Sequence, residues 1–143
     1  MNFNNYTIKA QEAVQKATEI AGGNQQQAIE TGHLLKGLFQ SDENVLSSLA
    51  KKLGVNLNIL TPRLDAIVQA YPKVSGGSPY LANDAAAALQ RATGFLKEFD
   101  DEYVSVEHLL LGLLGGKDAV ATLMKDAGFN EKDLKAAIKE RRG

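Results

Sequence analysis

The sequence has no cysteine and no clear excess of charge of either sign. The absence of cysteine excludes disulfides, thiolate metal sites, cysteine nucleophiles and thiol redox chemistry, and it is compatible with a reducing compartment. Lys and Arg number 16 against 17 Asp and Glu, and the resulting net charge of −1 does not provide the positive field that nonspecific phosphate binding needs. Nucleic acid is therefore not an expected partner.

Long apolar runs are also missing. No stretch approaches the roughly 20 apolar residues of a membrane span. The polar opening, residues 2–6 (NFNNY), lacks the basic region and the apolar core of a signal peptide. We therefore expect a cytoplasmic domain that does not contact membranes. A chain of 143 residues predicts one domain, which buries roughly 68–70% of its unfolded surface and needs no disulfide or metal to fold.

What the sequence does contain is an internal repeat. Residues 29–38 (IETGHLLKGL) return as residues 104–113 (VSVEHLLLGL), and His108 follows His33 by 75 positions. Two units of this size, each too small to bury its own apolar face well, predict a pseudo-twofold helical domain. Such a domain favours a protein-recognition module over an enzyme with a cleft.

Apolar residues recur at helical spacing through both halves of the chain. We predict about eight helices, at residues 7–21, 31–39, 44–53, from 56 or 61 to 70, 83–99, 105–114, 118–127 and 130–141. The start of the fourth helix is open, because Thr61-Pro62 is typical of a cap followed by proline, whereas the repeat places Asn56 opposite Asn130. Gly54 is expected to end the third helix as a left-handed cap.

No segment alternates like a strand, so the predicted fold class is an all-α bundle of two four-helix repeats. Residues 71–80 combine two prolines with a Gly-Gly pair and cannot continue a helix. They predict the link between repeat one, about residues 1–70, and repeat two, about residues 81–143.

The repeated His-Leu-Leu helix starts at His33 and His108, the glycines Gly54 and Gly128, and the opening residues 1–13 (MNFNNYTIKAQEA) resemble the Clp amino-terminal domain family. The likeness covers essentially the whole chain and both repeats. This family caps ATP-driven unfoldases, and the opening residues look most like its disaggregase branch, the ClpB type. The resemblance therefore implies a domain that captures unfolded or aggregated proteins for threading.

Catalysis in this family belongs to ATPase modules, which bind ATP and magnesium and need a Gly-x-x-x-x-Gly-Lys-Ser/Thr loop. The nearest approach here, residues 115–118 (GGKD), lacks both the spaced first glycine and the hydroxyl. We expect the domain to be noncatalytic, free of cofactors and monomeric. The resemblance implies a hexameric ATPase parent that acts with a cooperating chaperone.

The resemblance also implies a shallow substrate groove beside the first helix, with polar residues of substrate handling at Thr7, Asp101 and Glu107. Each has a structural alternative. Thr7 can be a helix cap, Glu107 can be a favourable charge in the first turn of a helix, and Asp101 can belong to a solvated acidic loop.

Three apolar or aromatic residues complete the candidate site. Leu89 and Phe95 on the fifth helix are expected at the apolar wall of the groove, although both match the core stripe of the first helix. Tyr103 ends the acidic stretch at residues 98–103 (EFDDEY), which would attract cationic peptides. Its ring can anchor a peptide or pin the loop to the bundle.

Glu30-x-x-His33 has the spacing of the Glu-x-x-His element of di-iron bundles. The equivalent of Glu30 is Ser105, however, and the chain has only 2 histidines. We therefore expect no metal site. Each histidine is expected to pack at the start of a helix.

One departure from the family bears on the branch. Members of the protease branch often carry Glu immediately before His in both repeats, and in some of them this pair is associated with phosphorylated arginine. Here Gly32 occupies the first position and only Glu107 remains. This favours the disaggregase branch over the alternative, an adaptor-docking domain of a Clp protease unfoldase (ClpA/ClpC-like).

Overall fold

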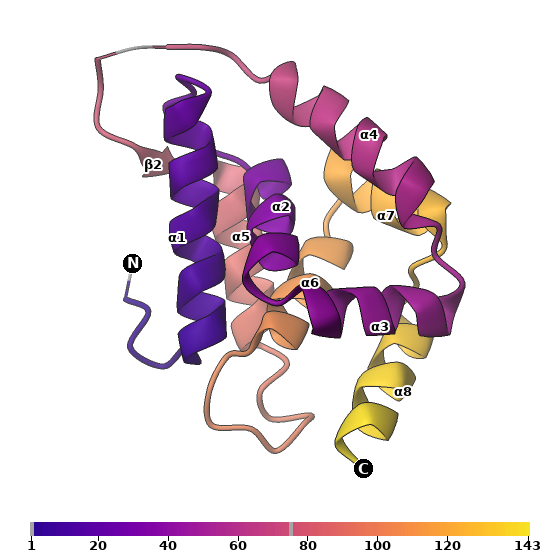
Figure 1. Ribbon diagram of the computed structural model, residues 1–143. Coiled ribbons are helices and arrows are strands. Elements are labelled where there is room, and N and C mark those ends of the chain that lie inside the picture. Colours follow the sequence, from indigo (N-terminus) through magenta and orange to yellow (C-terminus); the bar gives the residue numbers. More distant parts are fainter. Residues whose placement is uncertain (1, 75) are drawn as a thin grey trace.

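The computed structural model describes residues 2–74 and 76–143 (Figure 1), so Met1 and Ser75 lie outside the described residues. Eight helices form nearly all of the regular structure there. They are α1 (Ile8–Gly23), α2 (Thr31–Ser41), α3 (Glu43–Leu53), α4 (Leu57–Gln69), α5 (Asn83–Thr93), α6 (Val106–Leu114), α7 (Ala119–Ala127) and α8 (Glu131–Arg142). The predicted all-α class is confirmed.

Two short parallel strands, β1 (Ala28–Ile29) and β2 (Tyr80–Leu81), correct the prediction that no segment is a strand. A separate bridge joins Tyr6 to Val104. It is the repeat equivalent of the Ile29–Leu81 pair, because each partner is displaced by 75 positions. Strands of two residues are too short to alternate visibly in a sequence. The strand pair joins the entries to α2 and α5. The Tyr6–Val104 bridge joins the entries to α1 and α6, and Thr7 N donates to Val104 O at 2.9 Å.

Helices of the two repeats pack against one another. Helices α1 and α2 pack together, as do α5 and α6, whereas α3 packs on α8 and α4 on α7 across the repeats (Figure 1). The close pairs depend on glycine. A Cβ built on Gly37 would lie 2.3 Å from Ala13 O, and one built on Gly112 would lie 2.3 Å from Ala88 O. Only a residue without a Cβ lets the backbones approach this closely.

The start of α4 resolves the open choice in favour of Asn56, whose side chain accepts a hydrogen bond from Asn58 N at 3.0 Å. Pro62 therefore lies inside the helix rather than at its first turn. Gly54 ends α3 with φ of 72°, the left-handed cap that the sequence predicted. The helix boundaries of repeat one thus follow local capping chemistry.

Helix α5 ends at Thr93, six residues before the predicted Phe99, which is a correction. Gly94 caps it, and the chain continues through turns with bonds such as Leu96 N to Thr93 O at 3.2 Å. Glycine favours this departure because it is a poor helix former. Asp100 then adopts φ of 56°, which directs the chain back toward α6.

The buried apolar side chains form one core that draws on every helix. The expected link at residues 71–80 contains Ser75, which lies outside the described residues, and its last residue Tyr80 opens β2. In the part of the chain that the structure describes, no helix has both the length and the apolar character that crossing a bilayer requires.

Candidate functional site

A surface groove of about 490 Å³ lies between the starts of α1 and α6, and the start of α3 and the end of α8 border it. Its lining includes Thr7, Ile8, Val45, Ser105, Glu107 and Arg142. Ile8 is 76% exposed, more than any other large apolar side chain among the described residues. Val45 beside it is half-buried. The groove therefore offers open apolar surface with polar groups at its edge.

Thr7 occupies the α1 side of this groove and caps the helix. Its Oγ1 accepts a hydrogen bond from Ala10 N at 3.1 Å. The structural alternative for Thr7 is thus present, and the residue lines the groove as well. Glu107 lies on the opposite side, in the first turn of α6, where a negative charge favours the helix. The structure brings these two candidates to one groove.

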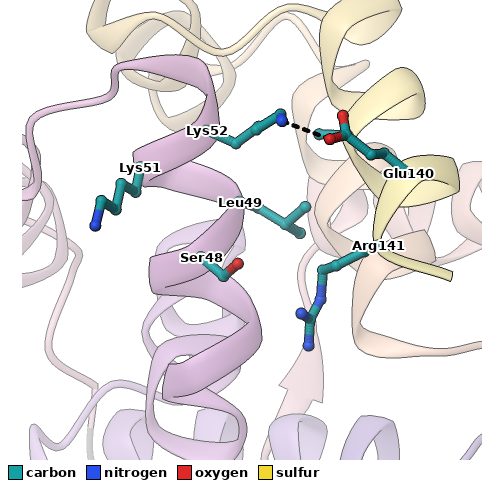
Figure 2. A pocket seen from close by; sticks show the side chains of 7 residues that line it. Ser48, Leu49, Lys51, Lys52, Glu140 and Arg141 are labelled. Carbon is teal, nitrogen blue, oxygen red and sulfur yellow. Dashed lines mark hydrogen bonds and ion pairs between the residues drawn. The ribbon is translucent and has the colours of Figure 1, made fainter. Parts of the chain in front are cut away.

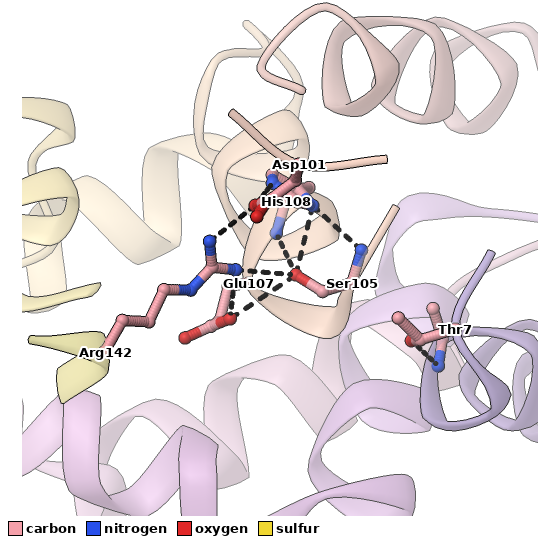
Figure 3. Close-up of polar contacts among 7 residues, drawn as sticks. Thr7, Asp101, Ser105, Glu107, His108 and Arg142 are labelled. Atoms are coloured by element: carbon pink, nitrogen blue, oxygen red, sulfur yellow. Dashed lines mark hydrogen bonds and ion pairs between the residues drawn. The ribbon is translucent and has the colours of Figure 1, made fainter. Parts of the chain in front are cut away.

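The acidic end of the groove is closed by an arginine that the sequence reasoning missed. Figure 3 shows the Arg142 side chain between Asp101 and Glu107. Its Nη1 lies 2.5 Å from Asp101 Oδ2, and its Nη2 lies 2.7 Å from Glu107 Oε1. Burial alone would lower the pKa of Arg142, but the hydrogen bonds to the two carboxylates hold it above its usual range. We define these three residues as the acidic clasp.

His108 lies against Asp101 of the acidic clasp and is 1% exposed. Ser105 N donates to its Nδ1 at 2.8 Å, so the ring proton resides on Nε2. Nε2 lies 2.8 Å from Asp101 Oδ2, in a direction too bent for a good hydrogen bond. Burial lowers the pKa of His108, and the neighbouring Asp101 partly opposes this effect. At neutral pH His108 is therefore an uncharged ring that lies against Asp101.

Repeat one holds the same arrangement in neutral form. Glu30 N donates to His33 Nδ1 at 2.9 Å, and His33 Nε2 lies 2.7 Å from Gln26 Oε1. Gln26 precedes Asp101 by 75 positions, so a buried amide stands where repeat two has a carboxylate. Burial lowers the pKa of His33 to about 4. Repeat one therefore carries a structural contact at this place rather than a charged site.

The departure at Gly32 has a packing cause. Gly32 N donates to Tyr71 Oη at 3.1 Å, and the Tyr71 ring lies 5.2 Å from that of His33. A Cβ on Gly32 would lie 2.7 Å from Tyr71 Oη and 2.9 Å from Val68 Cγ2. A glutamate at this position would have to displace Tyr71. In repeat one, the position equivalent to Glu107 therefore has no room for a carboxylate side chain while Tyr71 stays in place.

The structure does not bring the other four candidates into the groove lining. Asp101 lies outside the lining and contacts it through Arg142. Leu89 is 2% exposed and lies in the core, as the structural alternative held. Phe95 is partly buried, with Lys135 Nζ 5.0 Å from its ring centroid. Tyr103 is 54% exposed on the acidic loop. Within residues 2–74 and 76–143, no group of three or more His, Asp or Glu is placed to hold a metal ion, and this includes Glu30.

A second hollow lies between α3 and α8 (Figure 2). Lys52 crosses it and binds Glu140, with Nζ 2.6 Å from Oε1. Leu49 at its base is 1% exposed, so little apolar surface is open there. This hollow is a polar seam between two helices and offers an apolar segment far less than the groove beside Ile8.

Comparison with known proteins gives one consistent family. The model of the Clp repeat (R) N-terminal domain matches residues 5–140. The chaperone protein ClpB of Bacteroides thetaiotaomicron is 49% identical and that of Porphyromonas gingivalis 42% identical, each over 142 residues. These alignments cover 99% of this chain but only 16% of either relative. The Hsp104 N-terminal domain from Candida albicans has the same fold, with a TM-score of 0.80 at 22% identity over 98% of this chain and 93% of that one.

Proposed function

Since the chain belongs to the Clp repeat N-terminal domain family, we propose that it captures unfolded or aggregated polypeptides for a ClpB-type disaggregase. One observation carries the proposal, the open groove whose lining combines the exposed Ile8 with the polar Thr7 and Glu107. An unfolded segment can bury an apolar side chain against Ile8, while its backbone bonds the polar rim.

The proposed binding is weak and noncatalytic. The groove is open and its apolar surface small, which supports dissociation constants on the order of micromolar or weaker. Weak binding suits a platform that must release many different sequences to an ATP-driven pore. In the proposed cytoplasmic parent, ATP and magnesium act in other modules of a hexamer, and a cooperating chaperone assists.

Two observations support the disaggregase branch over the adaptor-docking alternative. The relatives compared above carry the name ClpB, and the first of the two acidic positions is sealed by Tyr71 against Gly32. An adaptor-docking domain would instead bind one folded partner through a defined surface.

Replacing Ile8 with aspartate is expected to weaken binding of a labelled, permanently unfolded polypeptide by at least about tenfold. Burying an isoleucine side chain stabilises a complex by roughly 1.5–3 kcal/mol, and the new carboxylate adds a desolvation cost. Fluorescence anisotropy of the labelled polypeptide measures the change.

The matched control is Ile59→Asp on α4, an equally drastic change at an isoleucine that is 51% exposed outside the groove. This variant should bind like the unaltered domain. Equal losses in the two variants, or no loss in Ile8→Asp, would remove the groove from the proposed function.

A further inference from the structure

Arg142 belongs to the last turn of α8, yet its side chain crosses to the start of α6 and covers the acidic end of the groove (Figure 3). Besides its bonds to Asp101 and Glu107, its Nη2 lies 3.5 Å from Ser105 Oγ. The guanidinium carbon lies 5.4 Å from the centroid of the Phe99 ring. Both edges and one face of the guanidinium are therefore engaged.

The acidic clasp differs from its repeat-one counterpart in one respect that matters for regulation. There, the equivalent place is filled by Tyr71 and the buried Gln26, whose Nε2 donates to Val68 O at 2.6 Å. Here it is filled by Arg142, whose side chain is 32% exposed. Such a side chain can withdraw into solvent without opening the core.

Arg142 is the cation that the two carboxylates of the acidic clasp share. Within the described residues, the only cationic side chain that pairs with Asp101 or Glu107 is that of Arg142, because His108 is buried and neutral. A planar guanidinium satisfies two carboxylates with separate N–H donors, which an ammonium cannot do as well. The group that best replaces Arg142 is thus another arginine side chain.

Building on the proposed function, we propose that Arg142 is an internal latch that competes with arginine side chains of bound polypeptides for Asp101 and Glu107. When a substrate arginine takes this place, Arg142 withdraws and the last turn of α8 is released. The groove then favours unfolded segments in which an apolar residue and an arginine lie close together.

The size of the effect follows from occupancy. A site that its own chain fills most of the time binds a competitor with an affinity reduced by the fraction of time it is open. For a partly exposed charge pair, this reduction is on the order of three- to tenfold. Removing Arg142 should therefore tighten the binding of arginine-bearing peptides by about this factor.

The test uses two short unstructured peptides, one apolar with a single arginine and its twin with the neutral isostere citrulline. Arg142→Ala is expected to bind the arginine peptide about three- to tenfold more tightly than the unaltered domain. Its gain in affinity for the citrulline peptide should be clearly smaller, so the ratio of the two affinities measures the competition for Asp101 and Glu107. The affinity of Arg142→Lys for the arginine peptide should lie between those of the unaltered domain and Arg142→Ala, because lysine keeps the charge but lacks the planar guanidinium.

Arg63→Ala, at an exposed position of α4, removes the same charge elsewhere and should change neither affinity. In backbone-amide NMR, the arginine peptide should shift the last turn of α8 in the unaltered domain. An unchanged or weaker affinity of Arg142→Ala for the arginine peptide overturns the latch, and so does an equal gain with citrulline.

The failure of the latch can be told apart from the failure of the proposed function. If the unfolded polypeptide binds and Ile8→Asp weakens it, but Arg142→Ala gains nothing, the latch alone is wrong. If neither the unfolded polypeptide nor either peptide binds the unaltered domain or Arg142→Ala, both proposals are wrong.

Discussion

Replacing Gly112 with alanine is expected to lower the free energy of unfolding by about 3 kcal/mol, because the added methyl group meets backbone rather than a movable side chain. Its Cβ would lie 2.3 Å from Ala88 O and 2.9 Å from Ala92 N. Relief requires α5 and α6 to move apart, and this opens the core between them. Denaturant unfolding followed by circular dichroism measures the loss.

Two further glycines make the comparison specific. Gly37→Ala should cost about as much, since its Cβ would lie 2.3 Å from Ala13 O in the equivalent pair of repeat one. Gly22→Ala near the end of α1 meets nothing within 4 Å and should stabilise the helix by roughly 0.5–1 kcal/mol. A Gly112→Ala protein as stable as the unaltered one would contradict the described contact of α5 with α6.

Acidification from about pH 7.5 to about pH 5 is expected to lower the free energy of unfolding by about 2 kcal/mol through His33 alone. Burial lowers the pKa of His33 from 6.5 to about 4 in the folded domain. Between these values the unfolded chain holds more protons, so acid favours unfolding. The stability that the uncharged His33 provides is fully present above about pH 6.5 and is lost as the pH falls toward 4.

The His33→Gln variant isolates this effect, because glutamine does not titrate. Its free energy of unfolding should vary less between pH 7.5 and pH 5 than that of the unaltered domain, by about 2 kcal/mol. NMR of the ring should also place the pKa of His33 well below its usual range. Identical pH dependence in the two proteins would show that His33 titrates normally.

The fold could be predicted largely because its determinants are local. Apolar residues at helical spacing predicted the helices, and the repeat around His33 and His108 and the cap at Gly54 helped to predict their ends. The short strands were missed because two residues cannot display alternation. The end of α5 was missed because the residues after Gly94 keep a helical apolar spacing, although they form turns.

The site was less accessible from the sequence. The family resemblance named Thr7, Asp101 and Glu107, and their roles remain predictions. Periodicity could not say whether Leu89 faces the core or the groove, and it lies in the core. The place of Arg142 depends on how α8 returns to α6, and no local pattern encodes that contact.

The sequence also did not reveal that Tyr71 packs on Gly32, the first of the two acidic positions. Gly32 could be recognised as a departure from the family pattern. Its cause is Tyr71, which lies 39 positions later and belongs to no sequence motif. Contacts of this kind arise from tertiary packing, which decides whether a small residue leaves a space or makes room for a neighbour.

A backbone-amide NMR titration with a permanently unfolded protein tests the central claim most directly, because it reports weak binding and its location together. The expected result is a set of shifts concentrated at Thr7, Ile8 and Glu107, with Ile59 on α4 unaffected. The absence of shifts at millimolar ligand, or shifts centred on α4, would contradict the assignment of the groove as the binding site for unfolded polypeptides.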